Sequence, residues 1–258
     1  MILFKKKYKY IFCILPIILL FRYELVFFLD GYYIEDTVGE VFLSHLFGGS
    51  FQMEKLNFTQ SVFGLFPLIY FSILFADYIV QDFFANGEYI FTRYTSRASW
   101  YKKKLLGTAA YSIIGVFLTL LLYVYCGIRE SGYPITSKDI TLILCTYIML
   151  LLFLYFGTIC LNIFVMYQGT TIGFVIYYSG LAISTIAALM IQKLPNKNIA
   201  QILHCINPMS NIFVSWNFSD IYVLWGIGYY IILCILISVL LWKITKKREI
   251  GINVRVET

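Results

Sequence analysis

The sequence predicts an all-α, polytopic membrane protein with six transmembrane helices, and three observations support this fold class. First, 60% of the 258 residues are hydrophobic and 13% are charged, with a mean hydropathy of +0.78, which is outside the range of soluble domains. Second, six apolar stretches come close to or exceed the length of about 20 residues that crosses a hydrocarbon core: 10–29, 62–80, 105–128, 140–165, 170–191 and 222–242. Third, backbone polar groups in lipid must be satisfied within their own segment, so these stretches are helices. No linker or repeat divides them, and we expect residues 1–258 to form one domain.

Most of the twenty Lys and Arg residues flank the spans on one side. That side holds Lys5, Lys6, Lys7, Lys9, Arg93, Arg97, Lys102, Lys103, Lys104, Lys243, Lys246, Lys247, Arg248 and Arg255. The other side holds Lys55, Arg129, Lys138, Lys193 and Lys197. The positive-inside rule therefore places both termini and residues 81–104 in the cytoplasm. The net charge of +6 is explained by this topology and does not indicate a nucleic-acid partner.

The first apolar stretch is interpreted as a retained helix. Its basic start resembles a signal peptide only in charge, because no small-residue cleavage site follows. Arg22 and Glu24 interrupt it two residues apart, on nearly opposite faces, so they do not simply pair with each other. Either both side chains reach the outer headgroup region, or at least one faces a polar cavity or a partner helix.

Two outer loops are long. Residues 30–61 are acidic and contain Gly48-Gly49, and their length predicts a partly ordered cap or a functional loop. Residues 192–220 contain apolar side chains at helical spacing, which predict a short amphipathic helix at the interface: Ile199, Ile202, Leu203 and Ile206. This helix is expected to break at Asn207-Pro208 and to resume at Met209, giving two half-helices joined by a proline turn.

The inner segment 81–104 is far longer than a simple connection requires. Asn86-Gly87 is a turn signal, and the segment after it predicts a short cytoplasmic amphipathic helix over residues 87–95. Glu88 suits its first turn. Spacing by four residues places Ile90 with Tyr94 on one side and Arg93 with Arg97 on another.

The same segment is rich in aromatic residues that have no hydrocarbon to enter. Ser96 or Ser99 is expected to cap a helix that continues through Trp100 and Tyr101 into the third span. We expect the aromatic side chains to pack on a partner protein on the cytoplasmic side. The alternative is a helix that lies on anionic lipid.

Small residues line the fifth span at Gly169, Gly173, Gly180, Ser184 and Ala188. In lipid such positions let helix backbones approach closely. The contact can lie within one subunit or across a dimer interface, and the sequence leaves both open.

Polar residues inside the spans are few. Asp77 is interpreted as an interfacial residue near the basic segment, and Asn162 and Gln168 as donors of hydrogen bonds between helices. A proton pathway would need several ionisable residues near the midplane, so the sequence argues against a proton-driven carrier.

Catalytic and cofactor motifs are missing from the sequence. It contains no GxSxG, no HExxH and no phosphate-binding loop, and His45 and His204 lie in separate outer loops. We expect no enzyme activity, no metal site and no cofactor in this chain, so any ATP-driven work requires an ATPase on another chain.

Taken together, these residues resemble type-2 permeases of ATP-binding-cassette (ABC) exporters. The likeness rests on the six spans, the basic amphipathic start at residues 4–10, the Asn207-Pro208-Met209-Ser210 stretch and the segment GEYIFTRYTSRASWYKKK, which is similar to a Gram-positive peptide export and immunity subgroup. The outer loop 30–61 is longer and more acidic, and the first interfacial helix shorter, than in that family.

The resemblance implies a permease in a bacterial plasma membrane that exports an amphipathic substrate such as a peptide. It implies cytoplasmic ABC ATPase subunits, which hold ATP and Mg, and a second permease chain in a homodimer or heterodimer. The implied ATPase-coupling residues are Glu88, Tyr89, Ile90, Arg93, Tyr94 and Arg97. Those implied at the pathway or dimer interface are Arg22, Glu24, Gly173, Gly180 and Ser184.

Two alternatives from other classes remain. One is the membrane substrate-binding subunit of a vitamin importer, although the first span is bulky from Cys13 to Ile17, where that class has small residues. The other is a non-transporting immunity or binding protein, which would need no ATPase.

Overall fold

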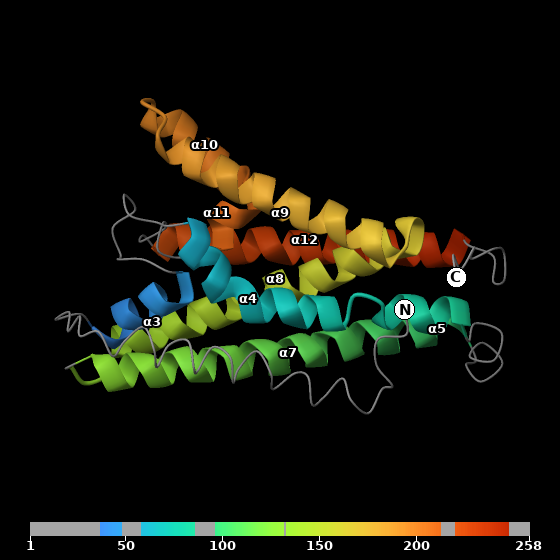
Figure 1. Ribbon diagram of the computed structural model, residues 1–258, viewed down its shortest axis with the longest axis horizontal. Helices are drawn as coiled ribbons and strands as arrows, with labels where there is room; N and C mark the ends of the chain where they lie inside the picture. The colour runs from blue at the N-terminus through green and yellow to red at the C-terminus, as the bar shows by residue number, and fades with distance from the viewer. Residues whose placement is uncertain (1–36, 48–57, 86–95, 132, 213–219, 248–258) are drawn as a thin grey trace.

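The computed structural model describes residues 37–47, 58–85, 96–131, 133–212 and 220–247, and every regular element within them is a helix (Figure 1). In chain order these are α3 (Val38–Phe47), α4 (Phe58–Leu74), α5 (Tyr78–Ala85), α7 (Arg97–Glu130), α8 (Ser137–Gln168), α9 (Thr170–Gln192), α10 (Lys197–Ile206), α11 (Pro208–Ile212) and α12 (Asp220–Lys247). Of these, α7, α8, α9 and α12 are long and apolar enough to cross a membrane. The first predicted span, residues 10–29, lies outside the described residues.

The two ends of the bundle hold the elements that the predicted topology places together. The helices α3, α10 and α11 lie at one end, whereas α5 and the last turns of α12 lie at the other (Figure 1). The first group belongs to the predicted outer loops, and the second group flanks the predicted cytoplasmic segment. Which end faces the cytoplasm stays a prediction.

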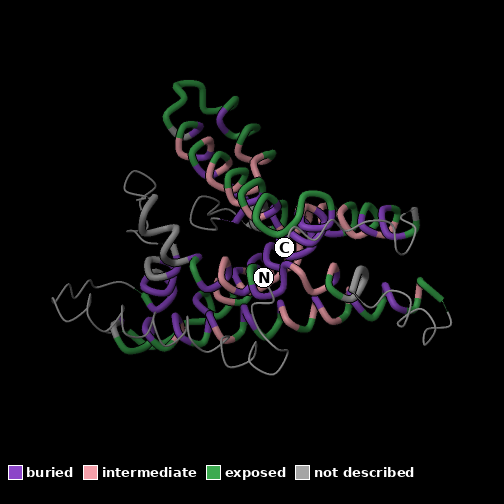
Figure 2. Tube along the Cα trace, turned by 45° about the vertical axis from the view of Figure 1, so that its right-hand side comes forward, coloured by how far each residue is buried: buried purple, intermediate pink, exposed green. Residues whose placement is uncertain are grey.

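The helix α8 forms the centre of the bundle. In its most apolar 18-residue window 67% of residues are buried, against 33% for α7, 22% for α12 and 17% for α9. The main core gathers large side chains from α3, α7, α8 and α12, among them Phe42, Tyr123, Leu150 and Tyr230. The purple trace in Figure 2 follows this centre, while α9 and α10 lean outward with much of their surface exposed. Their exposed faces are available to lipid or to another chain.

Local sequence explains where the long helices begin and end. Ser96 caps α7 by accepting a hydrogen bond from the N–H of Ser99 at 3.2 Å, as the sequence predicted. Thr136 and Asp139 form a reciprocal capping box at the start of α8. Gly169, with φ of +80° and ψ of 172°, provides the turn between α8 and α9 in a region that only glycine readily adopts.

Asp139 also joins α8 to α3. Its Oδ1 accepts a hydrogen bond from the N–H of Gly39 at 3.0 Å, so one buried carboxylate serves the first turns of two helices. A Cβ on Gly39 would lie 2.6 Å from that oxygen, so this approach requires glycine. The acidic outer loop is therefore partly ordered, as its length predicted.

The second predicted span is interrupted. The sequence predicts one helix over 62–80, but α4 ends at Leu74 and α5 begins at Tyr78 after a three-residue turn. Helical structure also enters the segment 81–104 from both sides, since α5 runs to Ala85 and α7 begins at Arg97.

The prediction that the loop aromatics pack on a partner protein is wrong for two of them. Trp100 and Tyr101 are only 2% and 7% exposed and lie in a core cluster with Ile79, Ile159 and Leu241. The Tyr101 hydroxyl donates a hydrogen bond to the carbonyl of Ser238 in α12. These rings close the bundle at the end that holds α5, because α7 starts at Arg97, about two turns before the apolar stretch 105–128 that predicted its span.

Candidate functional site

The candidate site consists of two helix breaks within the bundle, the α10–α11 hairpin and the α4–α5 turn. Backbone that leaves helical hydrogen bonding at membrane depth is tolerated only where protein or a polar cavity satisfies it. The freed backbone groups at each break therefore need partners from other helices.

Asn207 joins the two halves of the hairpin. It ends α10, and its Oδ1 accepts hydrogen bonds from the N–H groups of Met209 and Ser210 at 2.8 and 3.2 Å, which caps α11. Pro208 occupies the first position of α11, where a missing N–H has no cost. The predicted pair of half-helices with a proline turn is confirmed for the described residues, in which α11 ends at Ile212.

The same asparagine is fixed by the fifth span. The Ser184 hydroxyl donates to Asn207 Oδ1 at 2.8 Å, and Asn207 Nδ2 donates to the Ser184 carbonyl at 2.9 Å. This reciprocal pair ties the turn of the hairpin to α9. Any movement of α9 at this level therefore moves the turn with it.

The last carbonyls of α10 and the first of α11 also have partners. Asn211 Nδ2 donates to the carbonyls of Cys205 and Asn207, both at 3.0 Å. Donors from α12 bind a second time at Cys205, from Trp225 at 3.2 Å, and also bind the carbonyls of Ile206, from Tyr229 at 2.9 Å, and of Pro208, from Tyr230 at 2.7 Å. Helices as short as α10 and α11 are not stable alone. The hairpin is therefore stabilised by hydrogen bonds from side chains of α9 and α12.

His204 of α10 contacts the other half of this hairpin. Its Nδ1 is 2.9 Å from the hydroxyl of Ser210, and the residue is half-buried. Burial lowers the pKa of the imidazole because it disfavours the charged form.

The second break, between α4 and α5, is satisfied by α8. The buried side chain of Asn162 accepts a hydrogen bond from the N–H of Ile79 at 2.9 Å and donates to the carbonyl of Phe75 at 2.9 Å. It also donates to the Thr158 carbonyl at 2.8 Å within its own helix. The prediction that Asn162 bonds between helices is confirmed, and its partner is the backbone of an interrupted span.

Lys104 closes the same break from α7. Its Nζ donates to the Tyr78 carbonyl at 3.1 Å and lies 3.8 Å from the centre of the Tyr78 ring, with only 7% of the residue exposed. A cation over an aromatic face in a desolvated place is a favourable contact of about 2 kcal/mol. Because α5 joins the cytoplasmic segment from one side and α7 from the other, Asn162 and Lys104 fasten both flanks of that segment to the bundle.

The comparison with known proteins gives a family and no function. A family described as a protein of unknown function, DUF2705, matches residues 11–251, nearly the whole chain. This chain belongs to the DUF2705 family. No curated protein and no solved structure matches it.

The structure places some of the residues that the sequence singled out in this DUF2705 chain. A Cβ on Gly173 would meet the backbone of Val165 at 2.8 Å, so Gly173 packs closely on α8 of its own chain, while Gly180 has open space around its Cα. Ser184 bonds Asn207, and Arg97 is exposed at the start of α7. The dimer and coupling roles of these residues stay predictions. Arg22, Glu24, Glu88, Tyr89, Ile90, Arg93 and Tyr94 lie outside the described residues.

Lys104 and Ser184 gain roles in the DUF2705 fold that sequence reasoning missed. Lys104 is the last of three consecutive lysines, and its place directly before the apolar stretch of the third span is the one signal in the sequence that distinguishes it as the buried one. The sequence pattern places Ser184 among the small residues of the fifth span, and nothing in that pattern predicts the hydrogen bond of its hydroxyl to Asn207. In the described part of the chain, no three His, Cys, Asp or Glu residues gather to hold a metal ion.

Proposed function

We propose that this chain is the transmembrane permease subunit of a type-2 ABC exporter. It would move an amphipathic substrate such as a peptide out of the cell, with ATP and Mg bound by a separate cytoplasmic ATPase. The observation that carries this proposal is the broken-helix hairpin α10–Asn207–Pro208–α11 directly before the last span. Such a hairpin is one of the features that carry the resemblance to these permeases, and crossing the bilayer alone does not require it.

The α4–α5 break supports the proposal from the other end of the bundle. Residues 86–95, where the coupling helix is expected, are bounded by α5 and α7. Asn162 and Lys104 hold these two helices to each other and to α8. An ATPase that moved this segment would therefore shift α5 and α7 together.

The helix α7 then offers a path to the outer end. It runs unbroken for 34 residues from Arg97 to Glu130, which corresponds to about 51 Å of helix. At its outer end it packs against α3, where the Cβ position of Gly127 lies 3.0 Å from the Val38 carbonyl. A rigid element of this length transmits a tilt at one end as a displacement at the other.

The test is purification of the tagged chain in mild detergent, with crosslinking through the segment 81–104 and mass spectrometry of what co-purifies. We expect a stoichiometric soluble protein with a nucleotide-binding loop, and a second permease chain if the complex is a heterodimer. With that ATPase, Glu88→Ala, Arg93→Glu and Arg97→Glu should abolish stimulation of ATP hydrolysis. Arg129→Glu is the matched control, because Arg129 is an exposed arginine at the opposite end of α7.

One observation favours a second candidate, a non-transporting immunity or binding protein. Trp100 and Tyr101 are used inside the chain, so they offer nothing to a cytoplasmic partner. Two results together would favour this candidate and exclude the exporter. The chain would purify alone after crosslinking, and cells that carry its Arg93→Glu variant would keep full resistance to the peptide against which the chain protects them.

A further inference from the structure

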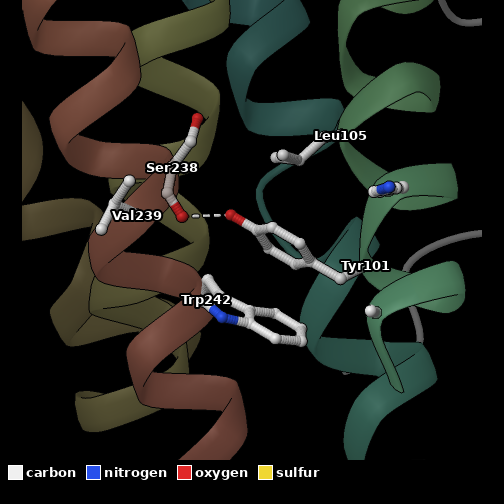
Figure 3. A pocket seen from close by; sticks show the side chains of 7 residues that line it. Tyr101, Leu105, Ser238, Val239 and Trp242 are labelled. Carbon is white, nitrogen blue, oxygen red and sulfur yellow. Dashed lines mark hydrogen bonds between the residues drawn. The ribbon is translucent and has the colours of Figure 1, made fainter. Parts of the chain in front are cut away.

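An apolar groove opens between the first turns of α7 and the last turns of α12. It has a volume of about 400 Å³ and is lined by Tyr101, Lys102 and Leu105 of α7 and by Ser238, Val239 and Trp242 of α12 (Figure 3). This volume is within the range of about 300–1,000 Å³ that is typical of small-molecule sites. The groove is separate from both helix breaks.

The floor of the groove is built rigidly. Tyr101 bonds the Ser238 carbonyl and so fixes α7 against α12, and its ring lies 5.1 Å from the Trp242 ring between centroids (Figure 3). The walls towards the membrane interior are hydrocarbon, from Leu105 and Val239. Val239 is 47% exposed, and the residues that follow the two wall residues in sequence are exposed too, Leu106 at 71% and Leu240 at 46%. The groove is therefore flanked by exposed apolar side chains.

Lysines lie beside the groove at its other end. Lys102 lines the groove with the apolar part of its side chain, and the residue is exposed. Lys246 follows Trp242 by four residues, which places it on the same face of α12 one turn beyond the groove, and it is also exposed. Among the residues that the structure describes, no acidic side chain lines the groove. Each of the two helices thus carries an exposed lysine in or one turn beyond the groove.

We propose that this groove binds an anionic phospholipid of the cytoplasmic leaflet, with an acyl chain against Leu105 and Val239 and the headgroup between Lys102 and Lys246. An apolar slot with two cations beside it matches the chemistry of that molecule, and the positive-inside rule puts this end of the spans beside anionic lipid. The proposal requires that the chain spans a membrane with this end of the bundle in the cytoplasm, and it does not depend on the exporter function.

Charge complementarity selects this occupant over the undescribed start of the chain. Residues 1–9 contain Lys5, Lys6, Lys7 and Lys9, which would be repelled by the lysines beside the groove. A lipid phosphate in the same place would be attracted.

Trp242 supplies a direct readout, because bromine atoms on an acyl chain quench tryptophan fluorescence only at close contact. The full chain is reconstituted in phosphatidylcholine vesicles with increasing fractions of acyl-brominated phosphatidylglycerol or of acyl-brominated phosphatidylcholine. The quenching that is due to Trp242 is obtained as the difference between the wild type and the Trp242→Phe variant. We expect brominated phosphatidylglycerol to reach half-maximal quenching at a lower fraction, by roughly fivefold for each lysine, and this preference to shrink with added salt.

The decisive variant is Lys102→Gln/Lys246→Gln, which should keep quenching by both lipids and lose the preference. Lys193→Gln/Lys197→Gln removes the same charge from positions at the other end of the bundle and should keep the preference. The proposal is overturned if both lipids quench the wild type equally, or if the preference survives in the groove variant. It is also overturned if neither lipid quenches Trp242, since another segment or a second chain then covers the groove.

Discussion

Asn162 in α8 accepts a hydrogen bond from the backbone N–H of Ile79, the second residue of α5, at 2.9 Å. Its amide group donates to the carbonyl of Phe75 on the far side of the α4–α5 turn. One side chain therefore replaces backbone hydrogen bonds that the interrupted span has lost. This replacement allows a membrane-buried chain to keep a break without unpaired polar groups.

Replacing Asn162 by leucine should destabilise the protein strongly. The change leaves a buried N–H and a buried C=O without partners, each at a cost of about 1–3 kcal/mol. We expect the midpoint of thermal unfolding in detergent to fall by several degrees. Thr158→Val is the control, because the Thr158 hydroxyl donates only to the Leu154 carbonyl within α8 and valine has the same shape. Equal losses in the two variants would contradict a special role for Asn162.

The small residues of α9 should separate into two classes on substitution. Gly173→Ala places a methyl group 2.8 Å from the Val165 backbone nitrogen, where backbone rather than a side chain must move, and overpacking of this kind costs about 1–3 kcal/mol. Gly180→Ala meets nothing within 4 Å and should leave the melting temperature of the isolated chain unchanged or slightly higher. Thermal unfolding of the two variants in one detergent checks this.

Gly180 also offers a test of the proposed second permease chain. If α9 packs across a dimer interface, Gly180→Leu should shift the chain from dimer to monomer in size-exclusion chromatography with light scattering, while its melting temperature as a monomer is retained. If Gly180→Leu leaves the oligomeric state as it is, α9 does not form that interface through Gly180.

The sequence predicted those parts of the fold that depend on the length of an apolar stretch or on helix-capping residues. The third to sixth spans, the Ser96 cap and the half-helix break at Asn207-Pro208 were all predicted, because each depends on residues close together in the sequence. The second span was predicted as continuous, since the residues that stabilise its break, Asn162 and Lys104, come from other helices.

Burial at the inner end was misread for the same physical reason. Hydropathy does not show what the aromatic side chains of a basic segment contact, so the sequence predicted that Trp100 and Tyr101 pack on a partner protein. Their actual environment is formed by α5, α8 and α12, which the sequence does not bring together. The Ser184–Asn207 pair likewise joins residues 23 positions apart.

His204 should make the stability of the hairpin depend on pH. Burial lowers its pKa in the folded protein, whereas in the unfolded chain it titrates near the usual value of about 6.5. Below that value the unfolded state binds the proton first, so stability falls as pH decreases from about 6.5 towards the folded pKa.

His204→Asn keeps a polar atom near Ser210, where Nδ1 now lies, but cannot be protonated. Melting temperatures at pH 7.5 and pH 5.5 should therefore differ less in this variant than in the wild type. The variant His45→Asn, at the other histidine, controls for general acid effects. An unchanged pH slope in His204→Asn would remove His204 as the source.

Cys205 reports on both the sidedness and the closure of the hairpin. It lies half-buried in α10, and burial raises the pKa of its thiol, so a membrane-impermeant maleimide should label it slowly at neutral pH. The described cysteines Cys126, Cys145, Cys160 and Cys234 lie in membrane-length helices. Labelling of intact cells, read by mass spectrometry, should therefore modify Cys205, and modification only after the cells are opened would reverse the predicted topology.

Asn207→Ala removes the cap of α11 and both bonds to Ser184 at once. Because each of these three losses is worth about 1 kcal/mol, the hairpin should open more often and Cys205 should react faster by up to roughly a hundredfold. Asn198→Ala is the matched control, since Asn198 is an exposed asparagine on the same helix and should leave the rate unchanged. Equal rates in the two variants would mean that Asn207 does not hold the hairpin shut, and α12 donors such as Tyr230 would then be sufficient.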